Sequence, residues 1–132
     1  MTYLTKATLA LVASVALGLP AAAAAQGGGF MVDAAKAKAG MQAWKKFSCV
    51  GCHKIGGKTS GPDLAGVHER RSVEWLTRWL KNTTEMLQTD STAMALLKEW
   101  KGYKMPQIKM SDTDIEALIH FIAQETQKKR AV

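Results

Sequence analysis

Apolar side chains recur at three- and four-residue intervals in several stretches of the chain, and this is the period of an α-helix. The clearest stretch begins after Ser111 and has its apolar residues on one face, at Ile115, Leu118, Ile119 and Ile122. The same spacing predicts three further helices, over residues 34–47, 73–81 and about 92–100. Side chains that commonly cap a helix start precede the four stretches, namely Asp33, Ser72, Asp90 or Ser91, and Ser111.

The stretch 48–66, between the first two predicted helices, is rich in glycine and proline and lacks the alternation of polar and apolar residues that a strand would show. Such a stretch predicts a loop. The sequence therefore predicts an all-α fold of about four short helices joined by long loops. This is little regular structure for the length of the chain, which suggests that something other than side chains fills the centre.

The first residues follow a different pattern. One basic residue, Lys6, precedes a mostly apolar run over residues 7–19, Pro20 ends the run, and residues 21–25 are all alanine. These are the three parts of a secretory signal peptide. We expect residues 1–25 to be cleaved before Gln26, and residues 26–132 to form one domain in the periplasm. An uncleaved anchor is the alternative, although the run is shorter than the roughly 20 apolar residues that span a bilayer.

Composition narrows the class of protein. The chain has 132 residues, a formal net charge of +7, 47% hydrophobic residues and two cysteines. This balance is typical of one small, basic globular domain. Two cysteines are too few for a disulfide-rich scaffold, or for a zinc or iron–sulfur site with four thiolates. We expect no nucleic-acid binding, because an exported protein rarely meets nucleic acid and no basic–aromatic module is present.

Both cysteines fall in one motif, Cys49-Val50-Gly51-Cys52-His53. In an exported protein, C-x-x-C-H is typical of covalent attachment of a c-type haem. Two thiols three positions apart can each add to one vinyl group of the same porphyrin, and the adjacent histidine can reach the iron as the proximal ligand. We therefore predict that Cys49 and Cys52 hold one haem and that His53 ligates its iron.

Other uses of this motif fit the sequence less well. A dithiol redox site is expected to follow a strand, and no strand pattern precedes the motif. A zinc site needs four ligands, and the remaining histidines stand at no recognisable spacing from the thiols. A plain disulfide leaves the adjacent His53 unexplained.

An electron-carrying haem needs a second axial ligand, and methionine sulfur favours ferrous iron. The candidates in the predicted mature chain are Met31, Met41, Met86, Met94, Met105, Met110, His68 and His120. Met41 and Met94 fall on apolar helix faces, where methionine is more often a core residue.

The choice is between two methionines near the last helix. Met110 directly precedes the cap Ser111 and can pack on Ile115 as a hydrophobic staple, so it has a structural role already. Met105 lies in a loop that Pro106 stiffens. This reasoning favours Met105, with Met110 as the alternative.

Together these motifs resemble those of class I cytochromes c. The matching residues are Gly40-x-x-x-Trp44, Cys49-x-x-Cys52-His53, Gly61-Pro62-Asp63-Leu64, Met105-Pro106, and Ser111-Asp112 opening a helix with Leu118-x-x-Phe121. The resemblance implies a cytochrome c fold around one covalent haem, with His53 and Met105 as iron ligands. It further implies that the Pro62 carbonyl accepts a hydrogen bond from the His53 ring. Gly40 and Trp44 would pack against the last helix where the first helix crosses it.

Two features go beyond these motifs. The stretch 69–100 is long and rich in tryptophan, and we interpret it as a helical lid over the haem edge. Lysines flank the predicted haem loops, at Lys45, Lys46, Lys54, Lys58, Lys101, Lys104 and Lys109. Such a group of cations predicts fast, transient docking of an acidic redox partner.

We therefore expect a soluble electron carrier that moves single electrons between respiratory partners and is not an enzyme. We expect a monomer that meets membranes only through partner complexes. Two alternatives stay open. One is a haem subunit of a larger respiratory oxidase or reductase complex. The other is a ligand-binding or peroxidase-like haem protein with a labile methionine ligand, for which His68 and His120 are the available distal histidines.

Overall fold

The computed structural model describes residues 29–132, so the predicted signal peptide and its cleavage site lie outside the described residues. Between residues 29 and 132 the chain forms helices and loops but no strand, which confirms the predicted all-α fold. The elements are α1 (Ala34–Lys46), a 3-10 turn η1 (Cys49–Gly51), α2 (Val67–Arg70), α3 (Val73–Lys81), α4 (Thr83–Thr89), α5 (Ser91–Glu99) and α6 (Asp112–Arg130). None of the described helices has both the length and the apolar character needed to cross a membrane.

Four of these helices, α1, α3, α5 and α6, correspond to the predicted ones, and their caps form as expected. Each capping side chain accepts a hydrogen bond from the backbone N–H three residues later, at 3.0–3.2 Å, in Asp33, Ser72, Asp90 and Ser111. Asp90 rather than Ser91 caps α5. The structure adds α2 and α4, and α4 begins without a side-chain cap from its own N-cap residue, Asn82.

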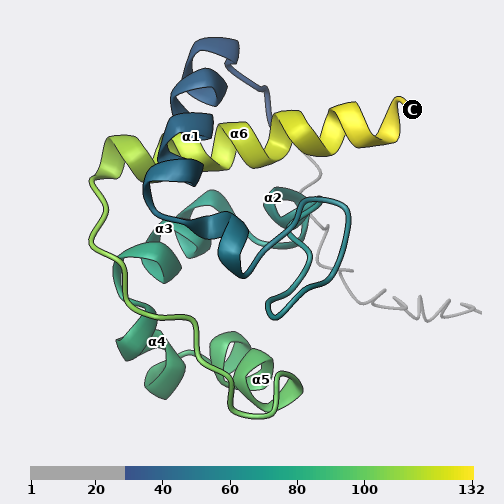
Figure 1. The fold of residues 1–132 in the computed structure, drawn as a ribbon. Coiled ribbons are helices and arrows are strands. Elements are labelled where there is room, and N and C mark those ends of the chain that lie inside the picture. Colours follow the sequence, from purple (N-terminus) through teal and green to yellow (C-terminus); the bar gives the residue numbers. More distant parts are fainter. Residues whose placement is uncertain (1–28) are drawn as a thin grey trace, which may run out of the picture.

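The helix α1 crosses α6, and this crossing is the most extensive contact between helices in the described part of the chain (Figure 1). A Cβ atom on Gly40 would lie 2.0 Å from the backbone oxygen of Ala117, so only glycine permits this approach. Next to the crossing, the rings of Trp44 and Phe121 lie 5.7 Å apart, and Leu118 belongs to the same buried cluster. The packing that the family resemblance implies is therefore confirmed.

A second cluster joins α3 to α6 through Leu76, Ile115 and Ile119. Beyond it, α4 and α5 extend away from α6 (Figure 1). The indole N–H of Trp75 in α3 donates to the Asp90 carboxylate at the start of α5, at 3.2 Å, and so links the two helices. The expectation that Met94 is a core residue is wrong, because its side chain is 50% exposed.

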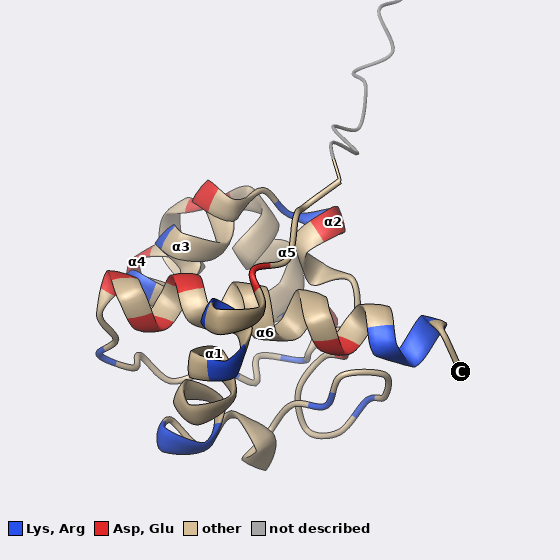
Figure 2. Cartoon of the chain, turned by 90° about the horizontal axis from the view of Figure 1, so that it is seen from above, with Lys and Arg blue, Asp and Glu red and all other residues tan. Residues whose placement is uncertain are grey.

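Cations gather at the C-terminal ends of two helices (Figure 2). Lys45 and Lys46 lie in the last turn of α1, and Lys128, Lys129 and Arg130 in the last turn of α6. Positive charge suits the negative end of a helix dipole. Arg130 also makes a bidentate ion pair with Glu69 of α2, with both N···O distances at 2.7 Å, which ties the end of α6 to α2.

The crossing yields the first testable prediction. We expect Gly40→Ala to lower the free energy of unfolding of the haem-loaded protein by about 2 kcal/mol, because overpacking outweighs the gain in helix propensity. Chemical denaturation followed by circular dichroism measures the change. Gly29→Ala is the matched control, since an added methyl group there meets no atom within 4 Å. Equal stability of the two variants would contradict the close crossing.

Candidate functional site

The C-x-x-C-H motif begins three residues after the end of α1 and forms a tight turn. Ser48 takes a left-handed backbone conformation with a φ of 55°, which ends the run of α1 and starts η1. The backbone N–H groups of Cys52 and His53 both donate to the carbonyl oxygen of Cys49, at 3.2 and 2.9 Å. Both thiols are free and half-buried, and burial raises the pKa of the Cys49 thiol.

The imidazole of His53 is held by a backbone acceptor. Its Nδ1 atom lies 2.9 Å from the carbonyl oxygen of Pro62. Because a carbonyl oxygen only accepts, Nδ1 is the donor, and in the neutral ring this leaves the lone pair of Nε2 free for a metal. This is the tautomer that a metal-ligating histidine uses.

Gly61 permits the contact between the His53 ring and the Pro62 carbonyl. A Cβ atom on Gly61 would lie 2.7 Å from the carbonyl oxygen of Cys52 and 2.8 Å from the His53 ring. The Gly61 N–H also donates to that Cys52 carbonyl, at 2.8 Å. The loop therefore lies directly against the motif, which sets the position of the Pro62 carbonyl.

The rest of the loop is fixed by Asp63 and by α6. The Asp63 carboxylate accepts from the N–H groups of Gly56 and Ala65, both at 2.8 Å. Burial acts to raise the pKa of Asp63, but these backbone donors outweigh it and lower the pKa below its ordinary value. Further along, the Gly66 N–H donates to the buried hydroxyl of Thr126 in α6, at 3.0 Å. The proximal loop is thus attached to the central helix.

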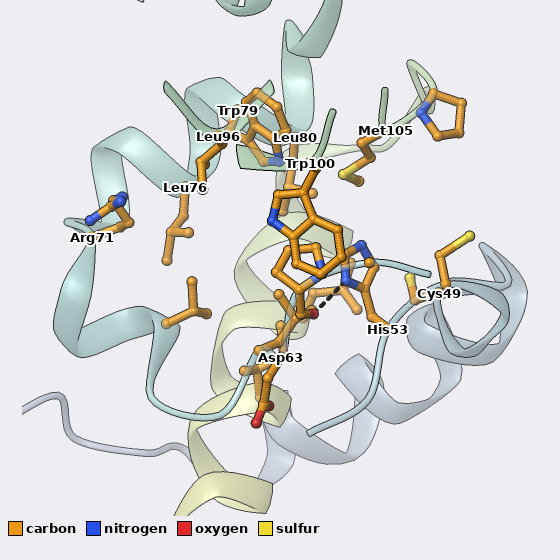
Figure 3. A pocket seen from close by; sticks show the side chains of 18 of the residues that line it. Cys49, His53, Asp63, Arg71, Leu76, Trp79, Leu80, Leu96, Trp100 and Met105 are labelled. Carbon is orange, nitrogen blue, oxygen red and sulfur yellow. Dashed lines mark hydrogen bonds between the residues drawn. The ribbon is translucent and has the colours of Figure 1, made fainter. Parts of the chain in front are cut away.

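A cavity of about 360 Å³ lies between this loop and the helices α3–α5. Cys49, Cys52, His53, Pro62 and Met105 all line this cavity. Figure 3 shows Cys49, His53 and Met105 around it. The stretch interpreted as a lid contributes aromatic and aliphatic side chains, at Trp75, Leu76, Trp79, Leu80, Leu87, Leu96, Leu97 and Trp100. Arg70, Arg71 and Lys104 are the cations among the lining residues.

This set of residues fits a haem. Aromatic and aliphatic side chains can pack on the flat apolar porphyrin ring, and cations can pair with its two carboxylates. The cavity also brings together two thiols, an imidazole with the required tautomer and one thioether. All five predicted site residues, Cys49, Cys52, His53, Pro62 and Met105, therefore line the same space.

The alternative ligand candidates lie elsewhere. Met110 is absent from the cavity lining and packs against both core clusters, as expected for a hydrophobic staple. Met41 also packs on the core, Met86 is a buried residue of α4 within the lid, and Met31 is 88% exposed.

Two histidines, His68 and His120, are not among the described residues that line the cavity. The ring of Phe30 lies between them, 5.5 Å from His68 and 4.7 Å from His120. The Asp33 N–H donates to Nδ1 of His120 at 3.1 Å. Burial lowers the pKa of His68, whose side chain is 4% exposed, below its ordinary value of 6.5. These histidines hold the start of the domain against α6, so neither is placed to act as a distal group.

The chain matches the family model of cytochrome c over residues 37–126. It belongs to the cytochrome c family. As a cytochrome c domain, residues 37–126 carry a covalently attached c-type haem with its iron and support haem-based electron transfer. The covalently attached haem that the C-x-x-C-H motif predicts is therefore confirmed.

Three known proteins are similar to this cytochrome c. Subunit 2 of cytochrome c oxidase from Alkalihalophilus pseudofirmus is 35% identical over 89 residues, which are 65% of this chain and 25% of that protein. The chain thus spans about a quarter of that relative. The structure of a cytochrome c from Rhodothermus marinus has a TM-score of 0.69 and 24% identity, covering 90% of this chain and 91% of that one. An engineered variant of the same cytochrome has a TM-score of 0.67 and 24% identity, covering 89% and 91%. At 24% identity, the likeness to these two structures shows a shared fold alone.

Sequence reasoning missed several residues that shape the site. The sequence predicts a helical lid over residues 69–100 but does not show which of its side chains, such as Trp79 and Leu80, line the cavity. Sequence reasoning also missed Thr126, whose hydroxyl both accepts from the Gly66 N–H and donates to the Ile122 carbonyl. No sequence signal marks such a role, because the partners lie far apart in the chain.

Proposed function

We propose that this cytochrome c is a soluble periplasmic electron carrier in which His53 and Met105 are the two axial ligands of the haem iron. The observation that carries the proposal is that the Met105 thioether and the His53 imidazole line one cavity with Cys49 and Cys52. The periplasmic location rests on the predicted signal peptide.

When bound, the haem supplies a one-electron couple at its iron. Cys49 and Cys52 would anchor it through thioether bonds, and the Pro62 carbonyl would keep Nε2 of His53 oriented towards the metal. With the haem bound, Trp79, Leu80 and the other lid side chains would exclude water from the cavity. Because a low dielectric disfavours the added charge of ferric iron, the lid would raise the reduction potential.

We further propose that this cytochrome c is not an enzyme. With His53 and Met105 as ligands, the chain would supply both ligands of the iron, and a substrate would have no place there. Electron transfer would need no such place.

The partner in this proposal is an acidic redox protein that docks transiently on a monomer. The seven lysines near the haem loops are all exposed. Lys46 pairs with Asp114 at 3.3 Å, whereas the other six have no ion-pair partner among residues 29–132. Uncompensated cations attract an acidic surface and steer its approach.

A second candidate function is that of a haem domain working within a respiratory oxidase. The similarity to a cytochrome c oxidase subunit 2 favours it. The free carrier and the oxidase domain share the same haem chemistry. They differ in whether the protein leaves its partner after each electron transfer.

Replacement of the two competing methionines tests the ligand assignment. We expect Met105→Ala to abolish the thioether-to-iron absorption of the ferric protein and to lower its reduction potential by on the order of 100 mV or more, because the axial ligand sets that potential. Met110→Ala is the matched control and is expected to lower stability while leaving the spectrum unchanged. Optical spectra and redox titration measure both. The reverse pattern would assign the ligand to Met110.

Charge reversal tests the docking surface. We expect Lys54→Glu with Lys58→Glu to slow oxidation of the ferrous protein by ferricyanide about fivefold at low ionic strength, and the effect to vanish at about 0.5 M salt. Lys38→Glu with Lys128→Glu makes the same change in net charge outside the haem loops. Stopped-flow kinetics measures the rates, and equal slowing by both pairs would show that only net charge matters.

A further inference from the structure

The segment that carries Met105 has few attachments to the rest of the protein. The Tyr103 N–H donates to the carbonyl of Trp100 at the end of α5, and regular structure resumes only at α6. Between these points, in residues 104–110, no backbone group hydrogen-bonds to another backbone group of the described chain. We call residues 104–110 the Met105 segment. Its far end is held by packing of Met110 on the core.

One side chain of this segment makes two hydrogen bonds to the lid. The amide nitrogen of Gln107 donates to the carbonyl of Lys81, the last residue of α3, at 2.7 Å. The amide oxygen of Gln107 accepts from the N–H of Thr84, in the first turn of α4, at 3.2 Å. These are the side-chain hydrogen bonds that join the Met105 segment to the rest of residues 29–132.

Both partners of Gln107 are helix-terminal groups that lack a partner within their own helix. The side chain of Asn82, which precedes α4, makes no capping bond, so Gln107 caps α4 from a distant part of the sequence. An amide is suited to this junction, because it carries one donor and one acceptor side by side.

We propose that Gln107 is a positioning residue for Met105, holding the Met105 segment to the α3–α4 junction so that the thioether stays in the cavity. Only Pro106 separates the two residues, and its ring fixes φ and restricts the residue before it. The backbone between Met105 and Gln107 therefore has little freedom. Movement of the Met105 backbone away from the cavity then requires that both Gln107 hydrogen bonds break.

The same amide couples the ligand to the lid. Trp79 and Leu80, which line the cavity, directly precede the Lys81 carbonyl that Gln107 holds. Gln107 thus sets the distance between Met105 and the side of the cavity that α3 forms. This inference rests on the proposed His53 and Met105 ligation.

Competition by an external ligand tests the proposal. Imidazole is titrated into the ferric haem-loaded protein, and loss of the thioether-to-iron absorption reports displacement of Met105. We expect Gln107→Ala to raise the apparent imidazole affinity about tenfold, the effect of losing two ordinary hydrogen bonds. Gln107→Glu keeps an acceptor for the Thr84 N–H but cannot donate to the Lys81 carbonyl, so its affinity is expected to lie between those of the wild type and Gln107→Ala.

Gln88→Ala is the matched control. Gln88 is an exposed glutamine of α4 beside the same shallow surface groove as Gln107, and its side chain has no hydrogen bond within the described chain. Its imidazole affinity is expected to equal that of the wild type. Equal affinities in the wild type, Gln107→Ala and Gln88→Ala would overturn the role of Gln107 while leaving Met105 as the ligand. A wild type without the thioether absorption would instead overturn the ligation, and this inference with it.

Discussion

The close approach of α1 and α6 at Gly40 is the constraint on which the rest of the structure depends. It fixes the direction of α1, and only Phe47 and Ser48 separate the end of α1 from the first cysteine. The far end of the proximal loop is attached to α6 as well, through the hydrogen bond from the Gly66 N–H to Thr126. The bond between His53 and Pro62 lies between these two attachments. The orientation of the imidazole therefore follows from backbone packing at a helix crossing.

The opposite wall of the cavity is attached to the same helix. Leu76 of α3 packs on Ile115 and Ile119, and the Trp75 indole draws the start of α5 towards α3. The Met105 segment then returns from α5 to the N-terminus of α6 and is held on the way by Gln107. Because α6 organises both walls, a thiol-bearing turn and a distant methionine line one cavity. With His53 and Met105 as the proposed ligands, such rigidity would favour electron transfer, since neither ligand would have to move when the charge of the iron changes.

Local signals sufficed for much of this arrangement. Helical periodicity and capping residues predicted α1, α3, α5 and α6, and the chemistry of Cys49, Cys52 and His53 follows from their spacing. The Pro62 contact came from the family resemblance. Helix α4 was not predicted, because its β-branched Thr83, Thr84 and Thr89 weaken the helix signal and part of its cap comes from Gln107, 23 residues further along. The sequence also did not reveal which side chains of the lid face the cavity, since an apolar stripe on a helix does not show what it packs against. The signal peptide, the partner and the periplasmic location stay predictions.

The most direct test of the account is exposure of the native ferrous protein to carbon monoxide, followed by its optical spectrum. Carbon monoxide binds ferrous haem readily wherever an axial position is open. With His53 and Met105 both in place, we predict that the spectrum stays unchanged at neutral pH. Immediate formation of a carbon monoxide complex would contradict the account and would indicate a haem protein that binds ligands at its iron.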